Sequence, residues 1–284
     1  MTGIRFPANS PNSSAERHLQ MEFMKHTNEL NGMKKFLDHK EVPPQILKEA
    51  LAIIRNIAPN FPQLLRREHF LQQILILFRI HHEEMKQNGP LNPKSKYVKI
   101  LDIVEPCVIC VLSFIRDPES KRALFGPQSS PADKPLEEMF GVIDMLTDLL
   151  LILNAQLRHD PSLSRKQILL VMKITTQVLC LIAQEREGAF LIDERIKSKK
   201  PKQGEQPHPL KQHPLTTMIE AFDPPKDEAE KKINTFSKET INLIGRMNQD
   251  QMNGIFRPSE HLRRLANVHQ NILQGPPLPP QVHI

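Results

Sequence analysis

Two cysteines have a spacing that can support chemistry: Cys107 and Cys110 form a Cys-x-x-Cys unit inside an apolar run. On a helix, residues three apart share a face, so two sulfurs could reach one metal ion. Zinc needs four ligands, and the chain has no second Cys-x-x-Cys and no nearby pair of histidines. We therefore predict that both cysteines, and also Cys180, pack as small apolar core residues, and we expect no metal or cofactor.

A second candidate pair, His81 and Glu84 in the run HHEE, has the spacing of a metal-binding pair on a helix. A carboxylate-bridged metal site needs several such helices. We interpret the run as the solvated end of a helix. The run is also the start of a polar loop that we predict over His81–Pro93. The nucleophile-elbow, zinc-protease, phosphate-loop and dinucleotide-binding motifs do not occur in the chain. We therefore predict that the protein is not an enzyme.

A compact basic run lies within a proline-rich stretch and contains Lys197, Lys199, Lys200 and Lys202. Two interpretations stay open for it: a solvated loop, or a nuclear-import signal or phosphate-contacting patch. The formal net charge of +6 permits a nucleic-acid partner without requiring one. No aromatic residues alternate with the basic pairs at 66–67 and 263–264, so a platform for stacking bases is not expected.

Both ends of the chain differ in composition from the rest. Residues 1–15 are polar and rich in proline and serine, which predicts a disordered tail. Residues 275–284 are proline-rich, and their densest part is Pro276, Pro277, Leu278 and Pro279. Such a run adopts polyproline II, the conformation that SH3 and WW modules bind. A ligand for such a module and a tail without a partner are both compatible with this pattern.

The residues between the tails carry the apolar periodicity of helices, with repeats at steps of three and four. The segments with this periodicity are 14–36, 46–58, 64–80, 98–115, 135–157, 165–184, 215–222, 229–247 and 259–273. Asp117 and Pro118 are predicted to be the N-cap and the first residue of a further helix. Only 10 Gly accompany 25 Pro, and no strand-like alternation occurs, so we predict an all-α protein.

Four stretches share one form, in which an apolar helix is followed by a short polar break and then by a few residues ending in Leu, Phe or Ile. They are LAIIRNIAPNFPQLL, CVLSFIRDPESKRALF, VLCLIAQEREGAFLI and NLIGRMNQDQMNGIF. Repeated units of this kind bury one another's apolar faces by stacking. We predict an armadillo-like helical-repeat solenoid over 16–274, with about five or six irregular repeats and a basic, proline-rich loop at 197–214.

Several landmarks resemble a known family in their order and approximate spacing. They are Glu49-Ala50-Leu51, Pro62, Leu64-Leu65, Asn92-Pro93 and Cys107–Phe125. The family is the armadillo subunit of the Ccr–Not deadenylase complex, the required-for-cell-differentiation (Caf-forty) family. Its repeat corner resembles the residues Asp117, Pro118, Glu119, Arg122 and Phe125. The chain differs from the family in having no Trp, a shorter segment at 126–165 and an insertion at 197–213, so we expect a diverged relative.

This resemblance implies a non-catalytic adaptor in mRNA decay or translational repression. It would dock on a Not-type scaffold and present a groove to peptide segments of mRNA regulators. We expect the binding surface at the polar ends of the helices 98–115 and 165–184. A nucleic-acid-binding solenoid and an unrelated armadillo-type scaffold remain as alternatives, and homodimerisation is left open.

The expected location is the cytoplasm, with the nucleus as a second compartment if the basic run is an import signal. Three cysteines, an odd number, are typical of a reducing compartment. Met1–Ser14 lacks the apolar core of a secretory signal. We expect no membrane partner, because the strongest apolar run, Val142–Leu153, is short and contains two aspartates.

Overall fold

The computed structural model describes Leu37, Leu65 and residues 42–58, 69–87, 97–126, 134–159, 165–199 and 212–272. Within these residues the chain forms α-helices joined by turns and contains no β-strand, which confirms the all-α prediction. The two predicted tails and the predicted helix at 14–36 lie outside the described residues. So do Lys200, Lys202 and the proline run from Pro276 to Pro279.

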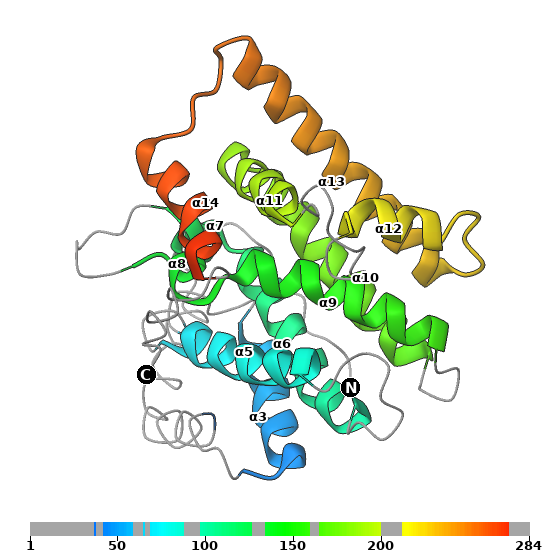
Figure 1. The fold of residues 1–284 in the computed structure, drawn as a ribbon. Coiled ribbons are helices and arrows are strands. Elements are labelled where there is room, and N and C mark those ends of the chain that lie inside the picture. The colour runs from blue at the N-terminus through cyan, green and yellow to red at the C-terminus, as the bar shows by residue number, and fades with distance from the viewer. Residues whose placement is uncertain are drawn as a thin grey trace, which may run out of the picture.

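A central row of four helices runs through the molecule (Figure 1). The row consists of α3 (Pro44–Ile57), α6 (Tyr97–Ile115), α10 (Arg165–Ala183) and α13 (Glu228–Met252). Helix α6 packs between α3 and α10, and α10 packs between α6 and α13. Each of the four sequence stretches that share one form contributes its apolar part to one helix of this row. The stretches that look alike in sequence are therefore neighbours in space.

A second row of helices covers the first. It consists of α5 (Phe70–Gln87), α9 (Val142–His159) and α12 (Pro214–Ala221). Helix α5 packs on α6, α9 on α10, and α12 on α13, while α9 also touches both of its neighbours in the second row. Phe70, Ile74 and Phe78, which are four residues apart on α5, are fully buried. The core between the rows is built mainly from aliphatic side chains, as the sequence composition suggests.

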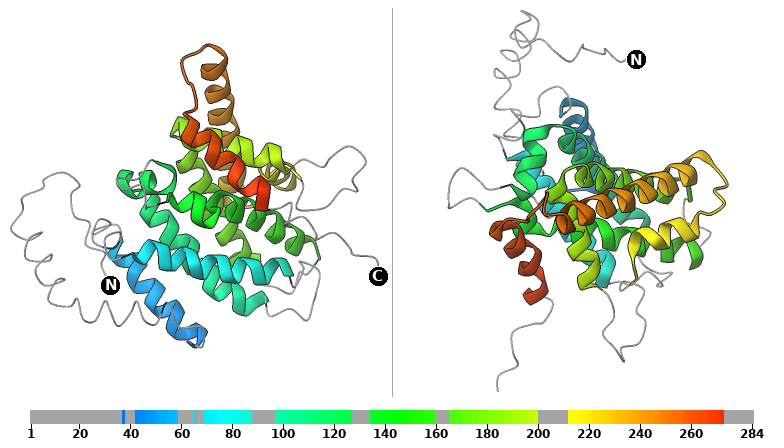
Figure 2. Two further views of the ribbon diagram at one scale, coloured as in Figure 1. Left: turned by 60° about the vertical axis from the view of Figure 1, so that its left-hand side comes forward. Right: turned by 90° about the horizontal axis from the view of Figure 1, so that it is seen from above.

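Four further helices complete the described part of the fold, and two of them, the yellow-green α11 and the red α14, lie side by side (Figure 2). They are α7 (Pro118–Phe125), α8 (Leu136–Phe140), α11 (Arg186–Ser198) and α14 (Glu260–Ile272). Helix α11 packs on α10, α13 and α14, and α8 contacts α7 and α14. These helices therefore bring residues from the middle and the end of the chain together.

The predicted single helix over 135–157 is wrong, because Gly141 divides it into α8 and α9. Gly141 has φ 61° and ψ 49°, a left-handed conformation that glycine adopts without the steric cost of a Cβ atom. The apolar periodicity continues on both sides of this glycine, which is why the pattern does not indicate the break.

Two predicted loop boundaries also differ from the structure. Helix α5 continues to Gln87, so the predicted loop over His81–Pro93 begins too early. His82 and Met85 are buried and extend the inward face of α5 by another turn. Helix α11 continues to Ser198, so Lys197 is helical and the predicted loop at 197–214 also begins too early.

Helix α10 is long and apolar enough to cross a membrane when judged by length and composition alone. In the fold, however, 67% of its most apolar window is buried among other helices. Helix α10 contacts α6, α9, α11 and α13, so it occupies the centre of the packing. Its apolar composition is therefore accounted for by its place in the core.

Replacing Gly188 by alanine is expected to destabilise the fold. An added Cβ at Gly188 would lie 2.2 Å from the carbonyl oxygen of Ile182, a backbone atom that cannot easily move. We expect the free energy of unfolding to fall by about 1–3 kcal/mol, the usual cost of overpacking. Urea unfolding of the purified chain measures this change.

Gly245→Ala is the matched control, because an added Cβ there meets no atom within 4 Å and the residue lies inside α13. Alanine should raise the free energy of unfolding by about 0.5–1 kcal/mol, since it loses less backbone entropy than glycine on folding. Equal stabilities for the two variants would contradict the packing described around Gly188.

Candidate functional site

Three helices of the central row end at corners where the chain turns. The corner after α6 begins with Asp117, whose Oδ2 accepts hydrogen bonds from the backbone N–H and the hydroxyl of Ser120, each at 2.8 Å. Pro118 then occupies the first turn of α7, so the predicted N-cap and helix start are confirmed. The corner after α10 is formed by residues 184–185, and the corner after α13 by residues 253–259.

The three corners lie side by side and are joined by charged side chains. Lys121 Nζ lies 3.0 Å from Glu185 Oε1 and donates to the carbonyl oxygen of Leu181 at 3.4 Å, which links the first corner to the second. Arg186 and Asp250 form an ion pair at 2.9 Å, which links the second corner to the end of α13. The corners therefore form one continuous edge of the molecule.

A cavity of about 540 Å³ opens along this edge, and we call it the corner cavity. All three corners and the start of α14 contribute to its lining. The lining residues are Pro118, Lys121, Arg122, Phe125, Gly126, Glu185, Glu187, Phe256, Arg257, Ser259, His261 and Leu262. The cavity lies at the C-terminal ends of α6 and α10, where the sequence led us to expect a binding surface.

The family-like repeat corner contributes unequally to the cavity. Pro118, Arg122 and Phe125 line it, because residues three and four apart share one face of α7. Asp117 instead caps α7, and Glu119 is exposed and lies outside the lining. The lining residues from the other two corners, which are distant in the chain, were not predicted from the sequence.

The corner cavity is lined partly by apolar side chains. Phe125, Phe256 and Leu262, three of its lining residues, are buried. Phe256 also packs edge-on against Phe190, with ring centroids 6.4 Å apart and an interplanar angle of 62°. This contact fixes the position of the third corner against α11.

The charged residues around the cavity fall into two groups. Lys121 and Glu185 form an ion pair with each other. Arg122, Arg257 and Glu187 are exposed, and among the described residues no ion pair or side-chain hydrogen bond involves them. Two arginines therefore remain available for a ligand, against one available carboxylate.

Ser259 and His261 have side chains of the kinds used in nucleophilic catalysis, but both support α14 here. Ser259 Oγ accepts the backbone N–H of Leu262 at 3.2 Å, in the first turn of the helix. His261 Nε2 lies 3.2 Å from the carbonyl oxygen of Phe125, which ties α14 to the end of α7. These two contacts hold one wall of the corner cavity in place.

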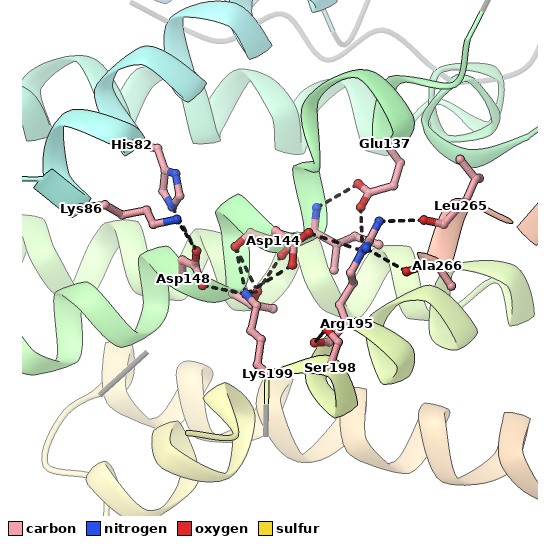
Figure 3. Close-up of polar contacts among 12 residues, drawn as sticks. His82, Lys86, Glu137, Asp144, Asp148, Arg195, Ser198, Lys199, Leu265 and Ala266 are labelled. Atoms are coloured by element: carbon pink, nitrogen blue, oxygen red, sulfur yellow. Dashed lines mark hydrogen bonds and ion pairs between the residues drawn. The ribbon is translucent and has the colours of Figure 1, made fainter. Parts of the chain in front are cut away.

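A buried arginine holds α14 further along its length (Figure 3). Arg195 of α11 donates from Nη1 to the carbonyl oxygen of Ala266 at 3.0 Å and from Nη2 to that of Leu265 at 2.9 Å. Its Nε lies 3.5 Å from Glu137 Oε1 and 3.4 Å from Asp144 Oδ2. Arg195 is only 1% exposed, so these groups replace the water that its guanidinium loses on folding.

Glu137 joins the same group from α8. Its Oε2 accepts the backbone N–H of Ile143 at 3.0 Å, in the first turn of α9. Burial raises the pKa of Glu137 to about 7, and Asp144 adds to this rise, while Arg195 and the N–H of Ile143 oppose it. The charge at this point of the core therefore changes near neutral pH.

A second part of the same group surrounds Asp148 of α9 (Figure 3). Lys199 donates to Asp148 Oδ1 and to Thr147 Oγ1, both at 2.6 Å. Lys86 lies 3.4 Å from Asp148 Oδ2, and His82 Nε2 lies 3.9 Å from the same oxygen. Asp144 connects the two parts, because its carboxylate also lies 3.4 Å from Lys199 Nζ.

We call the whole group the polar core network. It contains three cations and three carboxylates, with one histidine beside them. Its members are His82, Lys86, Glu137, Asp144, Asp148, Arg195 and Lys199. These residues come from α5, α8, α9, α11 and the position that follows α11, so the network joins α5, the α8–α9 pair and the end of α11, which are distant from one another in sequence.

The sequence pattern predicts a solvent-exposed position for His82, and this prediction is wrong. The run HHEE was interpreted as a solvated helix end, whereas His82 is 1% exposed. His81 and Glu84 do approach each other, with His81 Nδ1 3.4 Å from Glu84 Oε2. Two aspartates four residues apart inside an apolar run, at 144 and 148, were the signal in the sequence for a buried polar group.

The described part of the basic run is already paired with carboxylates. Lys199 is 11% exposed and bound within the polar core network. Lys197 lies on α11 and pairs with Asp193 at 2.7 Å and with Glu194 at 3.1 Å. An import signal or a phosphate contact suits lysines that project unpaired from a loop. Lys197 and Lys199 are both paired and do not have this geometry.

The three cysteines are buried, which confirms their interpretation as core residues. Burial raises the pKa of Cys107 well above its ordinary value and that of Cys110 to about 12. Cys110 Sγ also lies 3.3 Å from the carbonyl oxygen of Leu51 in the neighbouring α3. Among the described residues, no three His, Cys, Asp or Glu side chains are grouped closely enough to hold a metal ion.

No protein family, curated protein or solved structure matches the chain in sequence or fold comparisons.

Glu137→Gln should reduce the pH dependence of stability. The folded protein keeps the proton of Glu137 up to about pH 7, whereas an unfolded glutamate loses it near 4.5. This group therefore contributes stability that is present below about pH 4.5 and is lost as the pH rises through about 7. At about 1.4 kcal/mol per pKa unit, the loss is about 3 kcal/mol.

Urea unfolding between about pH 5 and about pH 8 measures this effect. The wild-type protein should lose stability relative to the Glu137→Gln variant as the pH rises. Parallel pH profiles for the two proteins would contradict the assigned environment of Glu137.

Lys199→Met should destabilise the fold by about 2–3 kcal/mol, because Oδ1 of the mostly buried Asp148 loses its cation and only Lys86, on the other oxygen, remains. Lys197→Met, the matched control, should cost less than about 1 kcal/mol, since its ion pairs are exposed to solvent. Chemical denaturation compares the two. A Lys199 variant as stable as the Lys197 variant would show that the contact with Asp148 has no structural role.

Proposed function

We propose that the protein is a non-catalytic adaptor whose corner cavity holds a peptide segment of a partner protein. The observation that carries this proposal is the convergence of three helix corners on one cavity, whose lining combines buried apolar residues with exposed charged ones. Its volume of about 540 Å³ lies within the range of about 300–1,000 Å³ that ligand pockets occupy. An apolar pocket with a few orienting polar groups suits a side chain presented by an extended segment.

The same proposal treats the central row of helices as an armadillo-like solenoid. Two corners support it by sharing a geometry: Asp117 N–H donates to Phe114 O at 3.0 Å, and Glu185 N–H donates to Ile182 O at 3.2 Å. Each corner follows a buried helix of the row and precedes a helix on the edge of the molecule. Stacked repeats of this kind build extended surfaces for partners.

The resemblance to the armadillo subunit of the Ccr–Not complex supports a role in mRNA decay or translational repression. In this proposal a Not-type scaffold and peptide segments of mRNA regulators are the partners, and the protein acts in the cytoplasm. Pro118, Arg122 and Phe125 support the connection, because these family-like residues line the corner cavity.

The contacts of the basic run favour the adaptor over a nucleic-acid-binding solenoid. Both described lysines of the run, Lys197 and Lys199, are engaged by carboxylates of the same chain. A phosphate backbone would have to compete with these contacts before it could bind. The adaptor proposal needs no such rearrangement.

Co-purification of the tagged full-length chain from native cells tests the proposal. Glu187→Trp places a bulky side chain at the mouth of the corner cavity, so specific partners should be lost. Arg246→Trp is the matched control, because Arg246 is exposed on α13 and lies outside the cavity lining.

A Not-type scaffold among the partners would support the Ccr–Not connection, and its absence would count against it. Partners retained equally by both variants would place the interaction away from the corner cavity. Circular dichroism of both variants checks that the fold is intact.

A further inference from the structure

The lining of the corner cavity contains two pairs of residues in which an arginine is close in the chain to a phenylalanine. On α7, Arg122 lies three residues before Phe125, so both side chains face the same side of the helix. In the third corner, Phe256 is buried and the adjacent Arg257 is exposed. At two separate points of the lining, an exposed arginine is therefore close in the chain to a buried phenylalanine.

The charges that remain available in the cavity do not balance. The lining contains Lys121, Arg122 and Arg257 as cations, and Glu185 and Glu187 as anions. Removing the Lys121–Glu185 ion pair leaves the two arginines and the single carboxylate of Glu187. The excess is one positive charge, so an occupant that carries a negative charge complements the cavity.

We propose that the corner cavity selects a peptide in which an acidic side chain adjoins a bulky apolar side chain. The apolar side chain packs on Phe125, Phe256 and Leu262, and the carboxylate pairs with Arg122 or Arg257. Arginine suits this task, because its planar guanidinium binds a carboxylate through two parallel hydrogen bonds. This inference rests on the proposed function, because it names the class of peptide that the adaptor recognises.

The mouth of the cavity is open to solvent, and this sets the character of the binding. Exposed charges are screened by salt, so affinity should fall as the ionic strength rises. The apolar contacts in the interior are insensitive to that change, so part of the affinity should persist in high salt. Binding with both components distinguishes this arrangement from a purely electrostatic surface.

Selection from a library of random short peptides displayed on phage, with the full-length protein as bait, tests the inference. Peptides are retained for study only if Glu187→Trp prevents their binding while Arg246→Trp does not. Acidic residues next to Leu, Ile, Met or Phe should be enriched among them.

A synthetic, fluorescently labelled copy of an enriched peptide then measures the contribution of each arginine. At least one of Arg122→Ala and Arg257→Ala should raise the dissociation constant by about fivefold, as expected for loss of an ion pair that is open to solvent. Arg246→Ala, an exposed arginine outside the cavity, should leave it unchanged. Replacing the acidic residue of the peptide by its amide should weaken binding to the wild-type protein but cause little further loss once its partner arginine has been removed.

The outcomes separate the two proposals. If the enriched peptides bind at the cavity but lack acidic residues, or if both arginine variants bind as the wild type does, the inference about acidic peptides is wrong while the adaptor proposal stands. If every enriched peptide binds the Glu187→Trp variant as well as it binds the wild type, the cavity is not a peptide site and both proposals fail.

Discussion

The burial of Arg195 is the interaction on which the arrangement of the outer helices depends. Removing a guanidinium from water costs several kcal/mol unless charged and polar groups replace the lost hydration. Here the carboxyl groups of Glu137 and Asp144 and two backbone carbonyl oxygens do so, and they come from α8, α9 and α14. A displacement of any of these helices would leave a buried charge without its partners.

The corner cavity depends on this buried contact although it lies at the surface. Helix α14 supplies one wall of the cavity, and Arg195 holds the middle of that helix through Leu265 and Ala266. The start of the same helix is held by the contact between His261 and Phe125. A solvent-exposed site with an ordered shape is thus built on a charged group inside the molecule, as preorganised binding requires.

The central row of helices gives the adaptor proposal its physical basis. Buried helices pack side by side, and the corners that follow α6, α10 and α13 contribute residues to the same edge. Charged pairs between neighbouring corners, such as Lys121 with Glu185, keep this edge continuous. Arg122, Arg257 and Glu187 of the lining form no ion pair or side-chain hydrogen bond in the described part of the chain, and in the adaptor proposal these three side chains are the ones that contact a ligand.

Most of the local structure could be predicted from the sequence, because apolar periodicity, an N-cap such as Asp117 and a following proline act over a few residues. The buried cysteines followed from the same local pattern. The sites of His82, Arg195 and Lys199 could not be predicted, since their partners lie about 50 to 70 positions away along the chain. Only the packing of the helix rows decides which charges meet in the core and which corners enclose the cavity.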